Sequence, residues 1–326
     1  MRTCLPVAVL LPALFLVACG GPATTIAIPT IGYVQFVESP QLLQGFDGFQ
    51  RALADAGLRA GTDFTISFRC AQGDMATIPL ILNSFIDQRV ALVATSTNPC
   101  MVAAAQRVRD LPVVMTISMD PAICGVPVVP PNMTGYFKPF SAASFLKLVR
   151  DCHPAATVIG IPYSPQEAHV EYAVNALRTL GEQQGLTVIL QPVSAVSELP
   201  DVAQALAAQG AQVFIVASDN TIYSGLAALV AVARDRKIPI FVTDVGRTEN
   251  GAAVGWGLDY FDWGYQSGMV AAEILRGKTV AELPLRSNEK FIVGFNDDEC
   301  RRQGLPLDPA VRARLLAGND TAAAHP

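Results

Sequence analysis

The sequence predicts an α/β protein built from two doubly wound parallel-sheet lobes that a multi-strand hinge joins. Short apolar runs of strand length alternate with amphipathic stretches of helical length, which is the pattern of parallel strands connected by helices. This alternation occurs as two similar series, separated by a proline-rich stretch from Pro121 to Pro131. The chain has 326 residues, of which 51% are hydrophobic and 16% charged, so it is long and apolar enough for two cores.

The first series begins near residue 31 and closes just after the proline-rich stretch. Its opening apolar run, Ile31 to Val37, is expected to be a strand, and the helix that follows is expected to end at Gly57, since glycine often ends a helix. We expect strands over 31–37, 64–68, 91–94, 113–117 and 133–136, and helices over 40–56, 76–88 and 99–109.

The second series repeats this alternation over residues 142–243. We expect strands over 158–162, 187–191, 213–217 and 240–243, and helices over 142–151, 166–184, 199–208 and 222–236. The tail adds a strand over 253–258, a helix over 260–275, a strand over 290–295 and a helix over 309–316.

These tail elements are too few to bury a core of their own, so we expect them to complete the two earlier sheets. The chain then passes between the lobes more than once, which predicts a hinge of several strands. The expected boundaries are 26–136 plus 251–284 for the first lobe, 137–250 plus 285–317 for the second and 318–326 for a tail.

The N-terminus resembles the signal peptide of a bacterial lipoprotein. Arg2 supplies the positive charge, an apolar segment follows, and Leu16-Val17-Ala18-Cys19 is similar to a lipobox, in which the cysteine sulfur takes a diacylglycerol. We expect residues 1–19 to be the signal peptide and Cys19 to be lipidated, which places the protein in the cell envelope, facing the periplasm or the extracellular side. An ordinary signal peptide with an incidental cysteine is the alternative.

Charge and cysteine content exclude several classes of partner. The chain has 23 basic and 28 acidic residues, and no basic cluster, which argues against nucleic acid. Only three histidines and no Cys-x-x-Cys motif occur, so we expect no metal and no cofactor. A disulfide between Cys70 and Cys100 is the favoured pairing, because these residues follow strands expected to be adjacent. Cys124 is the competing partner for Cys100, and Cys152 with Cys300 would form a second bridge. Five free thiols are the alternative.

Polar side chains gather where the expected strands end, which is where open parallel sheets bind ligands. Hydroxyl and amide groups that open a helix favour an anion such as a carboxylate, and carboxylates favour an ammonium, so together they suit a zwitterion between the lobes. Each of them is also an ordinary N-cap candidate. The candidate ligand-binding residues are Gln35, Thr95, Ser96, Thr97, Asp120, Tyr163, Ser164, Glu167, Asp219, Asn220, Asp244 and Asp259.

The order of motifs resembles the ABC-transporter substrate-binding protein family that includes tryptophan-type and other aromatic-amino-acid binding lipoproteins. The resemblance covers residues 30 to 316, although each motif alone is weak. Its motifs are Ile31-Gly32-Tyr33-Val34-Gln35, Gly45 to Leu53, Ala71-Gln72-Gly73-Asp74, Leu111-Pro112-Val113-Val114, Asp120-Pro121, Asn132-Met133-Thr134-Gly135, Ile161-Pro162-Tyr163-Ser164-Pro165-Gln166-Glu167, Asp219-Asn220-Thr221, Lys237-Ile238-Pro239-Ile240-Phe241, Gly257-Leu258-Asp259-Tyr260 and Ile274-Leu275-Arg276-Gly277.

The resemblance implies a type I periplasmic binding fold, an amino acid as ligand and an ABC permease as partner. The chain departs from the family pattern at Ser164, at Cys70 and over Pro99 to Val102, so the resemblance leaves the ligand's side chain open. A sensory receptor of the same fold is the alternative function. An enzyme is disfavoured, because the chain has no Gly-x-Ser-x-Gly elbow, P-loop or Gly-x-Gly-x-x-Gly motif.

Overall fold

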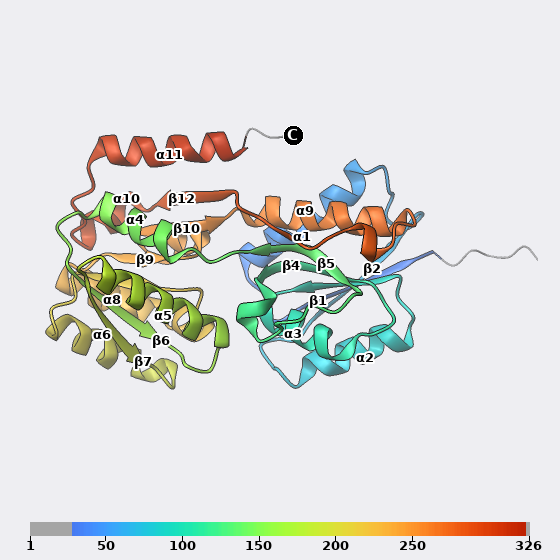
Figure 1. Ribbon diagram of the computed structural model, residues 1–326, viewed down its shortest axis with the longest axis horizontal. Coiled ribbons are helices and arrows are strands. Elements are labelled where there is room, and N and C mark those ends of the chain that lie inside the picture. Colours follow the sequence, from blue (N-terminus) through green and yellow to red (C-terminus); the bar gives the residue numbers. More distant parts are fainter. Residues whose placement is uncertain (1–27, 324–326) are drawn as a thin grey trace, which may run out of the picture.

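The chain folds into two lobes, each a six-stranded sheet with helices packed on both faces (Figure 1). The computed structural model describes residues 28–323, so the expected signal peptide and Cys19 lie outside the described residues. No helix within residues 28–323 combines the length and the apolar character that crossing a membrane requires.

The first lobe contains the N-terminal elements and part of the C-terminal third. Its elements are β1 (Thr30–Gln35), α1 (Pro40–Asp55), β2 (Thr65–Cys70), α2 (Thr77–Asp87), β3 (Leu92–Ser96), α3 (Asn98–Arg107), β4 (Val113–Met119), η1 (Pro121–Cys124), β5 (Met133–Lys138), α9 (Tyr260–Leu275), η4 (Val280–Glu282) and β11 (Arg286–Ser287).

The second lobe contains the middle of the chain and its last helices. Its elements are α4 (Ala142–Cys152), β6 (Val158–Tyr163), α5 (Ala168–Gln183), β7 (Thr187–Pro192), η2 (Val196–Glu198), α6 (Leu199–Ala208), β8 (Val213–Val216), α7 (Asn220–Ser224), α8 (Leu226–Arg236), β9 (Ile240–Val242), η3 (Val245–Asn250), β10 (Val254–Leu258), β12 (Phe291–Phe295), α10 (Asp297–Arg302) and α11 (Pro309–Ala323).

The two sheets share one doubly wound topology. The strand orders are β11-β5-β4-β3-β1-β2 and β12-β10-β9-β8-β6-β7, and every pairing is parallel except that of β10 with β12. The winding direction reverses beside β1 in one sheet and beside β6 in the other. Ligands of such sheets bind at this reversal, beyond the carboxyl ends of the strands.

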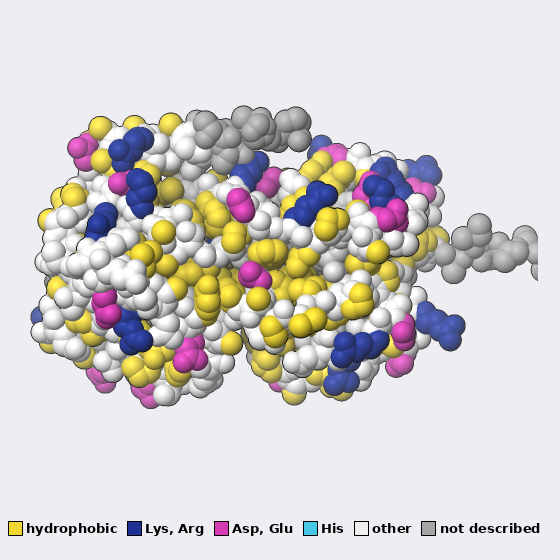
Figure 2. Space-filling view, viewed as in Figure 1, with side chains coloured by type: hydrophobic (Ala, Val, Ile, Leu, Met, Phe, Trp, Pro, Cys, Tyr) yellow, Lys and Arg dark blue, Asp and Glu magenta, His cyan; other side chains and the backbone are white. Residues whose placement is uncertain are grey.

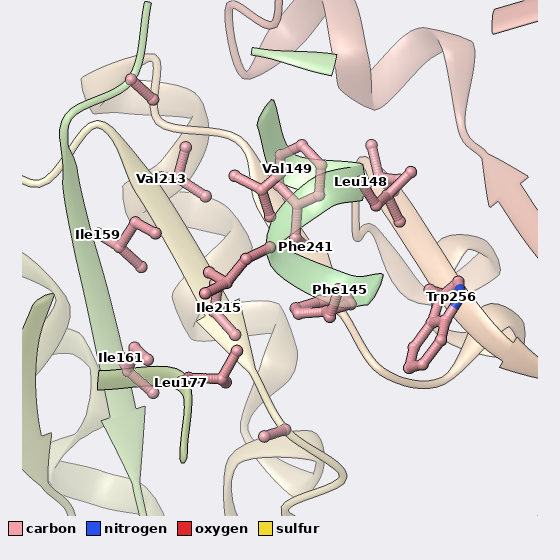
Figure 3. Close-up of a cluster of buried hydrophobic side chains, with 14 of the residues drawn as sticks. Phe145, Leu148, Val149, Ile159, Ile161, Leu177, Val213, Ile215, Phe241 and Trp256 are labelled. Carbon is pink, nitrogen blue, oxygen red and sulfur yellow. The ribbon is translucent and has the colours of Figure 1, made fainter. Parts of the chain in front are cut away.

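Burial explains why the inner strands of each sheet are mostly apolar. All seven residues of β4 are buried, as expected for a parallel strand covered on both faces by helices. In the second lobe, Phe145 and Val149 of α4 pack against Ile159, Ile215 and Trp256 of the sheet (Figure 3). Burial of such side chains contributes most of the stabilising free energy of each lobe.

Helices α1 and α9 pack unusually closely because glycines form the contact. A Cβ atom added at Gly264 would lie 1.8 Å from the carbonyl oxygen of Gly45, and one at Gly48 would lie 2.0 Å from that of Phe261. Ser39 caps α1 by accepting a hydrogen bond from the N–H of Leu42 at 3.2 Å. The close packing fixes α9, whose first residues border the cleft, against the first lobe.

Three segments connect the lobes, and all three predicted crossings are misplaced, the first because β5 continues to Lys138, past the boundary expected after residue 136. The connections follow β5, β10 and β11. Residues 254–258 were assigned to the first lobe, but β10 pairs with β9 in the second sheet, so the chain crosses at Asp259 rather than near residue 250. Residues 286–287 were assigned to the second lobe, but β11 pairs with β5 in the first.

Two predicted helices have different bounds. The helix expected over 222–236 is split into α7 and α8 at Gly225, where an added Cβ would lie 2.8 Å from Val196. The helix expected to end at Leu316 continues to Ala323, so most of the expected tail is helical. Along this helix, the side-chain amide of Asn319 accepts from the N–H and donates to the carbonyl of Val293, both at 2.8 Å, on the outer edge of β12.

The predicted Cys70–Cys100 disulfide is wrong. Cys70, Cys100, Cys124, Cys152 and Cys300 are all free thiols. Strand β1 lies between β2 and β3, so the end of β2 and the start of α3 are two strand spacings apart. That is roughly 10 Å, beyond the ~7 Å limit for the Cα atoms of a disulfide.

Candidate functional site

A cavity of about 110 Å³ lies between the lobes, at the carboxyl ends of both sheets. The space-filling view shows the lobes meeting along a furrow in which hydrophobic side chains gather (Figure 2). We call the cavity of about 110 Å³ the inner cavity. It is lined by Phe36, Val37, Ser39, Leu42, Thr97, Asn98, Ile117, Met119, Lys138, Ser218, Asn220, Tyr223, Thr243, Asp244, Arg247, Leu258, Tyr260 and Trp263.

One wall of the inner cavity is apolar and aromatic. Leu42, Ile117, Leu258 and Trp263 form a buried cluster, and Tyr260 packs against it with its ring centroid 6.2 Å from that of Trp263. The indole N–H of Trp263 is satisfied outside the cavity by a backbone carbonyl at 3.0 Å. The wall therefore presents ring and aliphatic surface, which suits an apolar or aromatic group of a ligand.

The wall beside Tyr260 is charged. Asp244 follows β9 and caps η3: one carboxylate oxygen accepts from the N–H of Gly246 at 3.1 Å, and the other accepts from Nε of Arg247 at 3.0 Å. The guanidinium of Arg247 lies over the ring of Tyr223, 4.5 Å from its centroid. Asp244 and Arg247 therefore neutralise each other within the lining.

Lys138 brings a further positive charge to this wall. It is the last residue of β5, only 4% exposed, and its amine donates a hydrogen bond to the backbone carbonyl of Thr243 in the other lobe. Its Nζ also lies 5.9 Å from the centre of the Trp256 ring. Burial lowers the pKa of Lys138 to about 8, although the charge of Asp244 acts in the opposite direction.

Three residues lining the inner cavity have a strained backbone. The φ angles of Thr97, Ile117 and Ser218 are 91°, 43° and 52°, in the left-handed region that non-glycine residues avoid. Each such conformation costs about 1–3 kcal/mol and persists where the surrounding structure imposes it, often at binding sites. Both lobes thus contribute residues with a strained backbone to the lining of the same cavity.

The hydroxyl of Thr97 is buried and has no hydrogen-bond partner within residues 28–319. The thiol of Cys100 lies beside it without meeting hydrogen-bond geometry. Thr97 precedes α3, whose first N–H groups lack partners within the helix. A ligand acceptor at this position would satisfy groups that the protein leaves unpaired.

A larger chamber, of about 730 Å³, adjoins the inner cavity, and we call it the outer chamber. Phe36, Asn98 and Asn220 line both spaces. Glu167 lines the outer chamber, where its carboxylate accepts hydrogen bonds from the backbone N–H of Asn220 at 3.0 Å and from the Asn220 side chain at 2.7 Å. Burial raises the pKa of Glu167, and these hydrogen bonds oppose the rise.

Four of the twelve predicted ligand-binding residues border these two spaces. Thr97, Asn220 and Asp244 line the inner cavity, and Glu167 lines the outer chamber. The other eight lie near the strand ends but line neither space. They are Gln35, Thr95, Ser96, Asp120, Tyr163, Ser164, Asp219 and Asp259.

Asp219, expected to pair with an ammonium, is instead an N-cap. Its carboxylate accepts hydrogen bonds from the N–H groups of Ile222 at 3.0 Å and Ser164 at 2.6 Å, and the residue is fully buried. Burial raises the pKa of this carboxyl group to about 6. Asp120 and Asp259 are N-caps as well, of η1 and α9.

The remaining predicted residues lie within the lobes. Gln35, Thr95 and Ser96 are fully buried at the ends of β1 and β3, and the Gln35 amide donates to the carbonyl of Val37 at 2.9 Å. The Ser164 side chain is also fully buried, and Tyr163 packs against the core of the second lobe. These side chains form the layer beneath the cleft.

Lys138, Tyr223, Arg247 and Trp263 line the inner cavity but were not among the predicted residues. Lys138 was missed because the predicted strand ended at Tyr136, whereas β5 continues to Lys138. A lysine that closes a buried strand is a signal that could have identified it. The spacing of Asp244 and Arg247, three residues apart after a strand, is a comparable signal for Arg247.

Comparisons with known proteins match almost the whole chain. The family model of the ABC transporter substrate binding protein matches residues 30–314. A tyrosine-binding protein of Clostridioides difficile strain R20291 is 31% identical over 296 residues, which make up 90% of this chain and 86% of that protein.

Two solved structures have the same fold. A ligand-free, open structure of a substrate binding protein with adhesive properties from Clostridium difficile aligns with a TM-score of 0.71 and 27% identity, over 86% of this chain and 97% of that one. An ABC domain from Streptococcus pneumonia in complex with L-Trp aligns with a TM-score of 0.79 and 24% identity, over 88% and 98%. The predicted type I periplasmic binding fold is confirmed, and the chain belongs to the ABC transporter substrate binding protein family.

Proposed function

We propose that the protein is the receptor of an ABC importer and that it holds a small zwitterionic ligand, an amino acid, in the inner cavity. The observation that carries this proposal is the position of the cavity. It lies at the carboxyl ends of both sheets and has strained residues of both lobes, Thr97, Ile117 and Ser218, in its lining. A ligand there contacts both lobes at once and favours their closure.

The lining suits an aromatic amino acid. Phe36, Tyr260 and Trp263 offer apolar ring surface to the side chain of the ligand. Asp244 is the carboxylate of the lining, and the hydroxyl of Thr97 with the start of α3 offers donors to a polar group of the ligand. The similarity to a tyrosine-binding protein and to a complex with L-Trp supports this ligand class.

Delivery to a membrane permease fits a receptor that is anchored outside the cytoplasm. The lipobox-like Leu16-Val17-Ala18-Cys19 supports a diacylglycerol anchor on Cys19. The receptor then stays at the membrane surface, where opening of the cleft releases the ligand to the permease. No chemical change of the ligand is needed for this role.

A thermal-shift screen of the twenty amino acids tests the ligand class. A ligand present at 100 times its Kd should stabilise the folded state by about 2.7 kcal/mol, which raises Tm by a few degrees. The protein is first unfolded and refolded, so that a co-purified ligand does not mask the shift. We expect aromatic amino acids to give the largest shifts, and absence of any shift would contradict the proposal.

A further inference from the structure

The charges around the inner cavity are unequally satisfied. Asp244 is engaged by Arg247 and by the N–H of Gly246, and Arg247 also lies over Tyr223. Among the described residues that line the cavity, Lys138 is the cationic residue that forms no ion pair, and its amine donates to the neutral carbonyl of Thr243.

A buried ammonium with one neutral acceptor is costly, because it has lost its hydration, and Asp244, whose charge raises its pKa, forms its ion pair with Arg247 instead. Two of its three N–H groups have no acceptor among the described side chains or carbonyls. An anionic group that enters the cavity and reaches Lys138 would remove this cost. The same is not true of a cationic group, because Asp244 already has Arg247 as its partner.

The other candidate carboxylates lie outside the inner cavity and already accept hydrogen bonds. Asp219 accepts from Ser164 and Ile222, and Asp259 caps α9 by accepting from the N–H of Asp262 at 2.7 Å. Asp120 caps η1, and Glu167, in the outer chamber, accepts from the backbone and side chain of Asn220. The binding energy available to a zwitterion is therefore concentrated at its carboxylate end.

We propose that Lys138 binds the carboxylate of the ligand and that the inner cavity selects aryl carboxylates, with the α-amino group contributing little. This inference rests on the proposed function and specifies its ligand class. Because Lys138 ends β5, on a connection between the lobes, and donates to Thr243 in the second lobe, the carboxylate would bind where the lobes are joined.

Three probes with the same ring separate the two ends of the ligand: L-tyrosine, tyramine, which lacks the carboxylate, and 3-(4-hydroxyphenyl)propionate, which lacks the amine. In calorimetric titrations of the wild-type protein we expect the propionate to bind within about tenfold of L-tyrosine, and tyramine to bind at least about 100-fold more weakly. The inference would be overturned if tyramine bound as tightly as L-tyrosine, or if 3-(4-hydroxyphenyl)propionate bound more weakly than tyramine.

Lys138→Met tests the residue itself. We expect its affinity for L-tyrosine to fall at least about 30-fold, whereas Lys147→Met, which removes an exposed lysine of α4, should bind as the wild type does. Unchanged affinity in Lys138→Met would overturn the assignment. If Lys138→Met does not fold, the three-probe series on the wild-type protein still decides. If none of the three probes binds the wild-type protein, this inference is overturned, whereas the proposed function is decided separately by the thermal-shift screen of the twenty amino acids.

Discussion

The carboxylate of Asp219, just after β8, accepts a hydrogen bond of 2.6 Å from the backbone N–H of Ser164, just after β6. Its other oxygen accepts from the N–H of Ile222 in α7 at 3.0 Å. The side chain thus joins two neighbouring strand ends to the helix that follows. It holds the second lobe's edge of the cleft in place without facing the ligand.

Replacing Asp219 should therefore affect stability rather than binding. In Asp219→Ala the cap of α7 is lost and the buried N–H of Ser164 is left unpaired, so we expect a loss of about 2 kcal/mol in the free energy of unfolding. Urea denaturation measures this loss, and titration with L-tyrosine should give a Kd within about threefold of the wild type. Asp259→Ala, which removes an exposed N-cap, is the control and should cost about 1 kcal/mol. A large loss of affinity with normal stability would show that Asp219 contacts the ligand.

Carboxylate binding should weaken as the pH rises through about 8. Burial lowers the pKa of Lys138 to about 8, so the free protein loses the ammonium above this pH, while the ligand carboxylate stays ionised. Of the groups facing it, Asp244 raises this pKa, and His169, whose own pKa burial lowers, stays neutral in this range. We expect the Kd of 3-(4-hydroxyphenyl)propionate to rise towards tenfold per pH unit between pH 8 and 9.5.

Lys138→Arg is the matched control for this pH dependence. A guanidinium keeps its proton between pH 6.5 and 9.5. The Kd of the Lys138→Arg variant for 3-(4-hydroxyphenyl)propionate should therefore not change with pH, even if the affinity is lower than in the wild type. A wild-type Kd that is constant from pH 6.5 to 9.5 would contradict protonated Lys138 as the ligand's partner.

Relieving the strain at Thr97 should stabilise the free protein and weaken binding. Glycine adopts the φ of 91° without steric cost, so Thr97→Gly should raise the free energy of unfolding by about 1 kcal/mol and remove the unpaired hydroxyl from the cavity. Arg89→Gly, at an exposed residue with a φ of 51°, should be stabilised to a similar degree and bind normally. Thermal melts measure the stability of both variants, and titrations measure their affinity. If Thr97→Gly and Arg89→Gly bind the ligand equally well, a ligand contact at Thr97 is contradicted.

The contact between α1 and α9 should not tolerate a side chain. In Gly264→Ala the new Cβ would lie 1.8 Å from the carbonyl of Gly45, so the helices must separate, at a cost of about 1–3 kcal/mol or more. Gln50→Ala, on the exposed face of α1, should stay within about 0.5 kcal/mol of the wild type. Equal midpoints of chemical denaturation for the two variants would contradict this close packing.

Lipidation should depend on Cys19 alone. In cells grown with radiolabelled palmitate, Cys19→Ala should abolish the label and leave an unprocessed or soluble form. Cys4→Ala should leave the label unchanged, because Cys4 precedes the apolar segment. Label that persists in Cys19→Ala would show that the lipobox assignment is wrong.

The fold could be predicted because burial on both faces leaves a clear pattern in the sequence. Strand β4, Val113–Met119, is apolar or weakly polar at every position, and helix α1 begins at Pro40, directly after the N-cap Ser39, a common sequence signal for a helix start. The sheet that each tail strand joins could not be predicted. The apolar run Val254–Leu258 could be buried in either sheet, and only its pairing with β9 shows that it belongs to the second.

The site could be predicted only as a region. Residues after strands cap helices and contact ligands with the same side chains, so Asp219 and Asp244 could not be distinguished in the sequence. In the structure they differ because Asp219 turns towards Ser164, whereas Asp244 turns towards Arg247 in the lining. The aromatic wall comes from α9, far along the chain, so no local pattern indicates its position.

The amide of Asn319 has a consequence for how the protein behaves at high protein concentration. An open strand edge offers N–H and C=O groups to any other extended chain, and it can begin intermolecular β-sheet growth. On β12, Asn319 occupies both polar groups of Val293, as a neighbouring strand would. The last helix thus protects the second sheet from aggregation, and a protease that removed it would expose the edge of an otherwise folded lobe.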